Sequence, residues 1–406
     1  MVYHNTYQNA CLGPTAVKEQ VDRVRAEKSM RIADPGVPLA RASHAPGFVY
    51  ESDEILAIEK QRVFLRDWLC VARVEEFERA GDYQTFDILG ERVLIARDEG
   101  GTLHASLNMC AHRGVAVATG AGNARNFRCP YHAWTYDLTG QLIHAPFMKG
   151  AEGFRIPDCR LRRVMLGEWA GWVFINFDET AEPLADFVAP FEQDFACLRQ
   201  QDCRLALKVV NDWACNWKYV VENLMDVYHV GAIHMASFAK TIRTADFPFD
   251  LRPRGGFATF TEGRPLTPDG KSLLGPLPWM ADRPETFACY GYLAPNLMML
   301  ARQDFVRPTV IWPLSPDRTR TVSYILLSGE QKALPGLDEK LQVYVDFIRQ
   351  IVEEDKPLVQ ALQQVAKSSL FVPGRLSELE KAIHHMGTYH AGRIASRPSN
   401  DADGAH

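Results

Sequence analysis

Two short segments in the first third of the chain most strongly constrain its fold, because each of them carries one cysteine and one histidine. Cys110 and His112 are separated by one residue, and Cys129 and His132 by two residues. Thiolates and imidazoles are the ligands that soft and borderline metal ions prefer in proteins. The pattern therefore predicts two facing loops that hold a metal centre between them.

Two kinds of centre are compatible with these four ligands. A tetrahedral zinc site uses the same donors, but zinc sites more often place two cysteines on one loop and two histidines on the other. In a Rieske [2Fe–2S] centre, two cysteines bind one iron and two histidines bind the other. Each loop of this chain supplies one ligand of each kind, as expected when each loop reaches both irons. We therefore expect a Rieske cluster, and zinc is the alternative.

The bulk composition excludes several classes of protein. The chain has 406 residues, which is long enough for two domains with sizeable cores. Its 45 basic and 50 acidic residues are nearly balanced and no basic block appears, so nucleic acid is not an expected partner. No apolar run has the length of a membrane span and no signal peptide is evident. We therefore expect a cytoplasmic protein without a membrane partner.

The nine cysteines do not indicate a disulfide framework, because their number is odd and they are scattered along a long chain. Two of them are assigned to the metal centre. We expect the others to be reduced packing residues, namely Cys11, Cys70, Cys159, Cys197, Cys203, Cys215 and Cys289.

The secondary structure that the sequence predicts changes along the chain. Val17, Val21 and Val24 recur at helical spacing, and a Pro- and Gly-rich connector follows at 35–46. From about Phe64 to Arg163 short β-type runs alternate with turn signals. A buried strand is expected at 172–177, and the second half mixes helices with strands. The predicted fold is α+β, with an N-terminal helical segment (1–60) packed on the catalytic domain, a β-rich Rieske domain (61–165), a catalytic domain (166–395) and a disordered tail (396–406).

A second candidate metal site follows about a hundred residues after the first. Residues 216–229 read as a largely buried helix, and His234 follows His229 by five positions. On an ideal helix these two side chains point about 140° apart, so a break at Gly231 would be needed to bring them together. Asp226 lies three residues before His229 and could orient its imidazole. Taken alone, the histidine pair is also compatible with a purely structural role.

Two histidines need one carboxylate to complete the three-ligand set of many non-haem iron sites. Residues 337–365 carry an apolar stripe in which Asp355 falls, whereas Glu353 and Glu354 are expected to project away from it. A buried carboxylate is costly unless a cation compensates it, so Asp355 is the predicted third ligand. Pro357 is expected to perturb the helix. Asp346 and Glu354 are the alternatives to Asp355, and the stripe consists of Leu341, Val345, Ile348, Val352, Val359 and Leu362.

From about residue 47 to 393 the chain resembles the terminal oxygenase α subunits of the Rieske non-haem iron oxygenases. The resemblance rests on the four cluster ligands and on the motif that runs from Glu222 and Asn223 through Asp226 and His229 to His234; Asp355 follows more weakly. It implies a catalytic domain whose helices flank an antiparallel sheet, and a head-to-tail homotrimer. By matching position, Asp226 would connect His229 to the partner subunit's His132, and Asn223 would lie near the iron.

The resemblance also implies the chemistry. The family activates O2 at a mononuclear Fe(II) with an electron from the [2Fe–2S] cluster, and inserts oxygen into a substrate. No glycine-rich fingerprint for a flavin or nicotinamide is evident in this sequence. Electrons from NAD(P)H would therefore arrive through a separate flavin reductase, with or without a ferredoxin.

The substrate is the least constrained part of the prediction. The aromatic residues of 238–305 could line an apolar pocket or enclose a quaternary ammonium group. Arg252, Arg254 and Arg264 are candidate anchors for a carboxylate, although solvated loop arginines are the simpler interpretation. The Glu-Asp-Lys-Pro form of residues 354–357 resembles α3 monooxygenases and demethylases. The aromatic candidates are Phe238, Phe247, Phe249, Phe257, Phe260, Trp279, Phe287, Tyr290 and Tyr292.

The predicted function is O2-dependent hydroxylation or oxidative demethylation of a small aromatic or alkylamine compound. One alternative is the α subunit of an α3β3 ring-dihydroxylating dioxygenase, which would give cis-diols. Another is a protein that only carries electrons or holds structural zinc.

Overall fold

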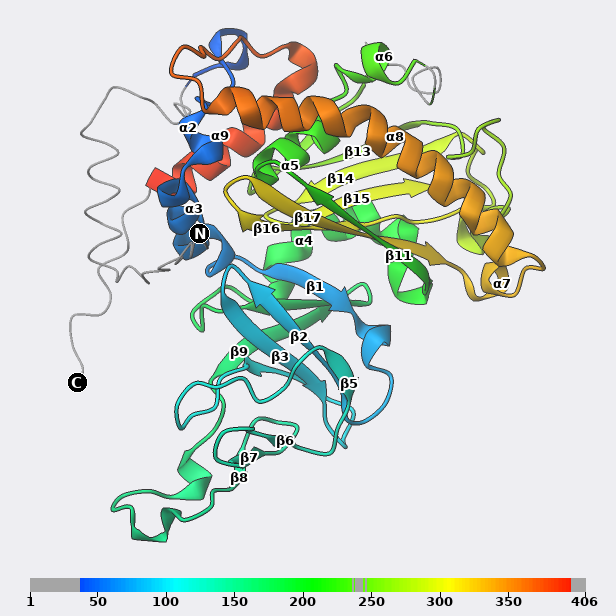
Figure 1. Ribbon diagram of the computed structural model, residues 1–406. Helices are drawn as coiled ribbons and strands as arrows, with labels where there is room; N and C mark the ends of the chain where they lie inside the picture. Colours follow the sequence, from blue (N-terminus) through cyan, green and yellow to red (C-terminus); the bar gives the residue numbers. More distant parts are fainter. Residues whose placement is uncertain (1–36, 236, 238–243, 245–246, 396–406) are drawn as a thin grey trace, which may run out of the picture.

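Two seven-stranded antiparallel sheets form the body of the molecule, and a small three-stranded sheet lies beyond the first of them (Figure 1). The structure is a computed structural model, and it describes residues 37–235, 237, 244 and 247–395. The predicted α+β fold, with a β-rich part and an antiparallel sheet flanked by helices, is confirmed. The helix expected around Val17 to Val24 and the tail expected to be disordered, 396–406, lie outside the described residues.

The first sheet has the strand order β1-β10-β9-β4-β3-β2-β5. Its hairpin between β2 and β3 turns at Leu89 and Gly90, both of which have positive φ, as a tight two-residue turn requires. The apolar side chains of β3 at Val93 and Ile95 then enter the core. The strands are β1 (Leu69–Arg73), β2 (Asp82–Ile88), β3 (Glu91–Arg97), β4 (Leu103–Leu107), β5 (Ala121–Asn123), β9 (Arg163–Trp169) and β10 (Trp172–Asn176).

The last two strands of this sheet come later in the chain than the sequence indicated. The β-rich region was expected to end near Arg163, but β9 and β10 pair with β4 and β1 and extend the first sheet to Asn176. Every residue of β10 is buried, because Val173 and Ile175 pack into one hydrophobic core and Trp172 and Phe174 into another. A domain boundary at 165/166 would therefore cut through β9.

The three-stranded sheet forms the end of the molecule farthest from the second sheet (Figure 1). It carries the loop of Cys129 and His132 between its first two strands, and it packs its own small core with Leu94 of the first sheet. Its strands are β6 (Phe127–Arg128), β7 (Thr135–Tyr136) and β8 (Leu142–His144).

The second sheet has the strand order β11-β17-β16-β15-β14-β13-β12 and is covered by helices on both faces. α4 (Leu184–Phe195) lies between the two large sheets, where Phe187 and Phe191 join one core with Phe174 of β10. α5 (Trp217–Met225) covers the opposite face. The strands are β11 (Arg204–Trp213), β12 (Asp250–Arg252), β13 (Gly256–Glu262), β14 (Phe287–Leu293), β15 (Leu297–Arg302), β16 (Thr309–Ser315) and β17 (Arg318–Leu327).

The long helix α8 (Leu337–Ala366) crosses over α5 and the second sheet (Figure 1). Pro357 does not interrupt it: the bond lost by proline would involve the carbonyl of Glu353, which lies on the exposed side where water can replace it. Asp355 is buried as predicted, whereas Leu362, assigned to the stripe, is exposed. The remaining helices are α2 (Phe48–Glu51), α3 (Asp53–Glu59), α6 (Val230–Ile233), α7 (Gly329–Lys332) and α9 (Lys381–Ala395).

A buried ionic network ties the N-terminal segment to the helices of the second sheet. Glu59 at the end of α3 accepts hydrogen bonds from Lys218 Nζ at 2.6 Å and Trp217 Nε1 at 2.8 Å, and His390 Nε2 of α9 lies 3.1 Å away. These partners lower the pKa of Glu59 to about 2 against the opposing effect of burial. None of the described helices is both long enough and apolar enough to cross a membrane.

Candidate metal centres

The two loops of the first centre have nearly the same backbone. In each, the carbonyl of the cysteine accepts a bond from the amide four residues later: Gly114 N at 2.8 Å and Ala133 N at 3.0 Å. Both of these residues have positive φ, so the two chains turn at equivalent points. The cysteines Cys110 and Cys129 are buried, whereas His112 and His132 are exposed. The centre therefore has a sheltered thiolate end and an accessible imidazole end.

The spread of the four ligands favours two irons over one zinc ion. The Nδ1 atoms of His112 and His132 lie 3.1 Å apart. No three of the four ligand atoms lie within 4.8 Å of one another, since the only such group in the described part of the chain is elsewhere. A tetrahedral ion with ligands at about 2.0–2.3 Å would bring all four within about 4 Å. The geometry fits a cluster with a thiolate iron and an imidazole iron.

Two residues beside this centre have roles that the sequence did not assign. The hydroxyl of Tyr136 lies 3.2 Å from Cys110 Sγ and accepts a hydrogen bond from the Ala111 amide at 2.9 Å. The indole of Trp134 stacks on the His112 ring, with centroids 4.9 Å apart. Hydrogen bonds to cluster sulfurs and solvent exposure are among the factors that set a cluster's reduction potential.

The second site depends on a break that the sequence placed wrongly. The helix expected over 216–229 ends at Met225, and Gly231 lies inside the short helix α6. The chain leaves the helix at Asp226, whose Oδ1 accepts a hydrogen bond from the amide of Tyr228 at 2.6 Å. Such an Asx turn competes with the helical hydrogen bonds and ends the helix. His229 directly precedes α6 and His234 directly follows it, and their two rings lie close together.

His229, His234 and Asp355 form one compact group, with one ligand atom from each lying within 4.8 Å of the others. The Nε2 atoms of His229 and His234 lie 3.5 and 3.0 Å from Asp355 Oδ1. That oxygen is buried and has no hydrogen-bond partner among the described residues. A cation at this point would offset the cost of burying the carboxylate. The group fits the two-histidine, one-carboxylate site predicted from the sequence.

Each histidine of this group is held by a second carboxylate. Asp226 Oδ2 lies 2.9 Å from His229 Nδ1, as the sequence suggested. Glu354 was expected to project away, but its Oε2 lies 2.7 Å from His234 Nδ1 and accepts from the hydroxyl of Ser237 at 2.6 Å. Both contacts leave Nε2 for a metal and fix the ring orientation. Glu354 and Asp355, which are adjacent on α8, thus contact the two ring nitrogens of His234 from opposite sides.

The two alternatives to Asp355 are now distinguished by position. Glu354 contacts His234 on the side opposite the metal-facing Nε2. Asp346 is exposed and pairs with Arg349 at 2.7 Å, so it does not join the group.

A cavity of about 170 Å³ with a mixed polar and apolar lining lies beside Asp226, and Asn223 lines it. Glu222 lies in its wall, and its Oε1 accepts a hydrogen bond from the Tyr50 hydroxyl at 2.8 Å. Burial raises the pKa of Glu222 to about 7. His44 and Glu380, an ion pair at 3.0 Å, complete the charged part of the wall. Nothing in the sequence pattern indicated that these distant residues meet at Asn223 and Asp226.

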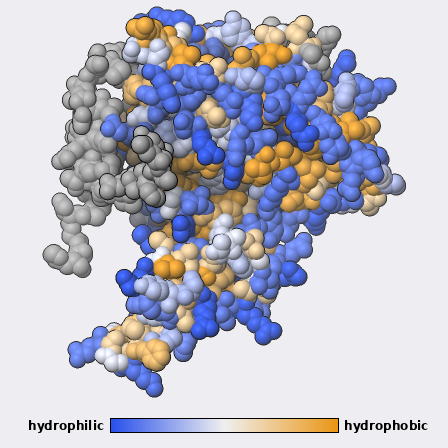
Figure 2. All heavy atoms as spheres, viewed as in Figure 1, coloured by the Kyte–Doolittle hydropathy of each residue, from blue (hydrophilic) through white to orange (hydrophobic). Residues whose placement is uncertain are grey.

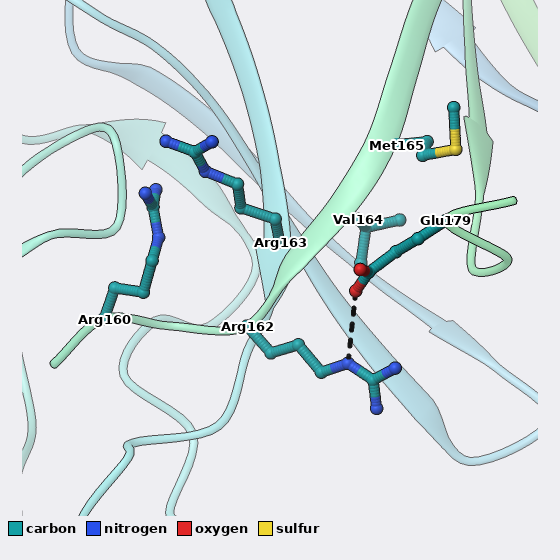
Figure 3. Close-up of a pocket in the computed structure, with 6 residues that line it drawn as sticks. All are labelled: Arg160, Arg162, Arg163, Val164, Met165 and Glu179. Carbon is teal, nitrogen blue, oxygen red and sulfur yellow. Dashed lines mark ion pairs between the residues drawn. The ribbon is translucent and has the colours of Figure 1, made fainter. Parts of the chain in front are cut away.

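A larger hollow of about 450 Å³ lies on the first sheet and has a basic lining (Figure 3). Arg162 pairs with Glu179 at 3.8 Å at its rim, and Arg160 and Arg163 point into the same region. None of the metal-site residues lines this hollow, so the volume of a cavity alone does not identify the candidate active site.

The aromatic residues proposed from the sequence divide between the two faces of the second sheet. Phe247, Phe249, Phe257, Tyr290 and Tyr292 gather on the α5 face. Phe287 and Trp279 pack on the α4 face, Phe260 is exposed, and Phe238 lies outside the described residues. Only the first set is on the side of the second metal site.

Two of the three arginines suggested as substrate anchors are already paired with carboxylates. Arg252 binds Asp194 through two nitrogens at 2.7 and 2.9 Å, and Arg254 pairs with Glu182. Arg264 is exposed. The charges of these arginines are therefore compensated or solvated, which agrees with the simpler interpretation given above.

Comparison with known proteins agrees with both centres. A family model for the Rieske [2Fe-2S] domain matches residues 67–157, and a model for the ring hydroxylating alpha subunit (catalytic domain) matches residues 200–396. Together these ranges cover well over half of the chain. The chain therefore belongs to the Rieske non-haem iron oxygenases and has the two domains of their terminal oxygenase α subunits.

The carnitine monooxygenase oxygenase subunit of Acinetobacter pittii (strain PHEA-2) is 35% identical over 201 residues, which are 49% of this chain and 54% of that protein. The chain thus spans about half the length of the first curated relatives it matches. The chloroplastic choline monooxygenase of Arabidopsis thaliana is 26% identical over 370 residues, 87% of this chain and 83% of that protein. A solved quaternary ammonium Rieske monooxygenase is similar over 89% of this chain and 96% of its own, with TM-score 0.74 and 26% identity.

Proposed function

We propose that this protein is the terminal oxygenase of a multicomponent monooxygenase that hydroxylates or oxidatively demethylates a small trimethylammonium compound. One observation carries the proposal: a buried carboxylate oxygen of Asp355 lies 3.5 and 3.0 Å from the Nε2 atoms of His229 and His234, so that the three ligand atoms converge on one point. An iron ion held there by three protein ligands would keep positions open for O2 and substrate, and would supply the oxygen-activating chemistry.

The chain's own residues prepare this site. Asp226 and Glu354 hold the Nδ1 atoms of the two histidines, so both rings present Nε2 to the same point. The side chain of His234 is only 1% exposed, and Asp355 is also buried. Water therefore has limited access to the ligand side of the site. Such shielding strengthens the electrostatic interactions within the site.

Two observations favour a trimethylammonium substrate over an arene. Related proteins are named for carnitine, choline and glycine betaine. Phe247, Phe249 and Tyr290 form an aromatic cluster on the site's side of the sheet, and such rings attract a quaternary ammonium group. A ring-dihydroxylating α subunit is the second candidate. Naphthalene 1,2-dioxygenase is similar with TM-score 0.72 but only 19% identity, which supports a shared fold alone.

We also infer that the working form is a head-to-tail homotrimer that receives electrons from a separate reductase or ferredoxin. The loops of His112 and His132 lie at one end of the molecule, and α6 with the second site lies at the other (Figure 1). Large apolar side chains are exposed near both ends: Tyr131, Ile143 and Phe147 by the cluster, and Tyr228, Leu362 and Phe371 by the second site. Hydrophobic surface at the cluster end is visible in Figure 2.

Such exposed apolar patches favour contact between subunits. In this arrangement Asp226 would connect His229 to the partner subunit's His132, and the electron would pass between subunits. Neither centre alone would then carry out the reaction.

The proposal is tested by changing His229 to alanine. The variant should keep the visible absorption of the [2Fe–2S] cluster, because its ligands are at the other end of the molecule. It should lose substrate-dependent O2 consumption, since one of three iron ligands is missing. His104→Ala is the matched control, because His104 pairs with Asp98 on the first sheet, away from both centres. Retained turnover in the His229 variant would show that oxygen chemistry occurs elsewhere.

A further inference from the structure

Accessible surface is confined to one small spot on the central strands of the second sheet. From residue 287 to residue 311 every side chain is buried except Tyr290, Leu300 and Arg307. Tyr290 and Leu300 face each other across β14 and β15, and the Arg307 amide donates to the Leu300 carbonyl at 2.7 Å. These three partly exposed residues are thus neighbours in the sheet.

This spot is on the face that carries the second metal site. Tyr290 packs against a core that includes Met225 and Val227, the two neighbours of Asp226. The other face of the same strands packs on α4 through Cys289 and Met299. Tyr290 and Leu300 therefore lie on the face of the sheet opposite α4, where α5 and α8 pack.

Two cations that have no carboxylate partner in the described part of the chain border this spot. Arg302 is 1% exposed and donates to three neutral oxygens: Tyr290 Oη at 2.5 Å, Ala301 O at 3.0 Å and Arg264 O at 3.2 Å. Arg307 has a buried Nε without a partner, and within the described residues its side chain makes no hydrogen bond or ion pair. Burial, and then the charge of Arg302, lower the pKa of Arg307 to about 10, so it is still a cation at neutral pH.

Among the described residues, the acid on the same turn forms no direct ion pair with either arginine. Asp304 is buried, but its Oδ2 accepts hydrogen bonds from the hydroxyls of Tyr344 on α8 and Ser272. A buried guanidinium without a counterion is costly, and such groups in proteins are usually paired. An anionic ligand would remove this cost.

Tyr290 adds a neutral donor at the same place. Its hydroxyl oxygen already accepts a hydrogen bond from Arg302, and its own proton has no acceptor among the described residues. A carboxylate between Arg307 and Tyr290 would accept from both groups. Charge-assisted bonds of this kind are the stronger class of hydrogen bond.

We propose that Arg307 and the Tyr290 hydroxyl, in the positive field of Arg302, bind the carboxylate of a zwitterionic trimethylammonium substrate. The inference rests on the proposed function and narrows its substrate class. The aromatic ring of Phe247 lies 5.7 Å from that of Tyr290, so rings for the cation and donors for the anion adjoin. Glycine betaine, carnitine or γ-butyrobetaine satisfies both halves, whereas choline has the same cationic head without the carboxylate.

The test is anaerobic calorimetric titration of the iron-loaded holoenzyme with glycine betaine, γ-butyrobetaine, choline and benzoate. Arg307→Gln should bind the two betaines about 10- to 100-fold more weakly than wild type and leave choline binding unchanged. Tyr290→Phe should weaken the betaines by a smaller factor. Arg254→Gln is the matched control, because its guanidinium is already paired with Glu182. It should bind all four compounds as wild type does.

A readout that does not depend on binding accompanies the titration. Because Arg307 has no counterion, Arg307→Gln should unfold at the same or a higher temperature than wild type without ligand. If Arg307→Gln fails to fold, the expected effect on stability is wrong and the carboxylate site is contradicted. Binding is then compared between Tyr290→Phe and wild type. Equal effects on choline and the betaines, or no effect on either, would overturn the inference. If only benzoate binds and requires Arg307, the carboxylate site stands and the trimethylammonium function fails.

Discussion

Asp355 and Glu354 are adjacent acids on α8 that have different roles, because their side chains point in different directions. Asp355 points into the space between the two histidines and keeps an unpartnered oxygen, whereas Glu354 reaches the far nitrogen of His234. Positions one residue apart on a helix differ by about 100°, so both cannot face the same point. One residue is placed to bind the metal and the other to orient a ligand.

This division of tasks is testable with two neighbouring substitutions. Glu354→Ala should lower iron affinity about 10- to 100-fold, because His234 loses the acceptor that fixes its ring. Glu353→Ala is the control, since Glu353 is exposed and contacts neither histidine. Iron content after titration with a chelator measures both. Equal iron retention in the two variants would contradict the orienting role of Glu354.

At the scale of elements, the segment from α5 to α6 determines the site. α5 is anchored by the buried Lys218–Glu59 pair, and its last turn presents Glu222 to the cavity beside Asp226. The Asx turn at Asp226 then ends the helix and lets His229 and His234 flank α6. A rigid helix followed by a sharp turn thus fixes where the two imidazoles meet.

Glu222 should make the stability of the fold depend on pH. Its pKa is raised from 4.5 to about 7 by burial, so the folded state binds more protons than the unfolded chain between these values. The free energy of unfolding should therefore fall as pH rises through this window, by on the order of 3 kcal/mol. Glu222→Gln cannot ionise and keeps an acceptor for Tyr50, so it should match wild type at pH 5 and exceed it at pH 8.

Denaturant unfolding at the two pH values checks this prediction. Glu192→Gln on α4 is the control, because Glu192 is exposed and should not alter the dependence on pH. A wild-type protein whose stability is the same at pH 5 and pH 8 would show that Glu222 is ionised at little cost.

Some of these features could be predicted from the sequence, because they depend on local spacing. The Cys-x-His and Cys-x-x-His loops are read directly, and Asp355 follows from the helical period of a buried stripe. Glu354 could not be assigned, since its contact with His234 depends on how α8 lies against a segment over a hundred residues earlier. The helix end at Asp226 was missed because the side-chain acceptor that causes it competes with an otherwise favourable helical pattern.

The other features that the sequence did not predict depend on contacts between residues that are far apart in the chain. The first sheet gains β9 and β10 only because β10 inserts between β1 and β9, which no local signal shows. The sequence did not indicate Arg307 and Tyr290 as a pair. The inference about them depends on Arg307 having no counterion among the described residues, which only the tertiary structure shows. Arg252 and Arg254 were suggested instead, and both are paired with acids.

At the scale of the whole molecule, the distance between the two centres is the dominant feature. The cluster loops and α6 lie at opposite ends of the chain's fold (Figure 1), so an electron has no short path within one subunit. Assembly in which the cluster end of one copy meets the second site of another would shorten that path. Asp226 lies where such a contact would place it, beside His229 and the 170 Å³ cavity.

Asp226→Asn should therefore separate electron transfer from metal binding. Both metals should remain bound, while oxidation of the reduced cluster by O2 and substrate should slow about 10- to 100-fold, because the charged link to His229 is lost. Stopped-flow absorption of the cluster measures the rate. Asp212→Asn, which changes an exposed acid paired with Arg320, should behave as wild type. A wild-type rate in the Asp226 variant would exclude the carboxylate from the electron path.

The measurement that tests the central claim most directly is a single turnover of the iron-loaded protein, reduced chemically without oxygen and then mixed with O2. The substrates offered are trimethylammonium compounds, aryl methyl ethers and unsubstituted arenes, and the products are identified by mass spectrometry with labelled O2. We expect labelled oxygen in a hydroxylated trimethylammonium product, or formaldehyde with its dealkylated partner. A cis-diol from an arene would move the protein to the ring-dihydroxylating group, and the absence of any oxygenated product would contradict the assignment of an oxygenase.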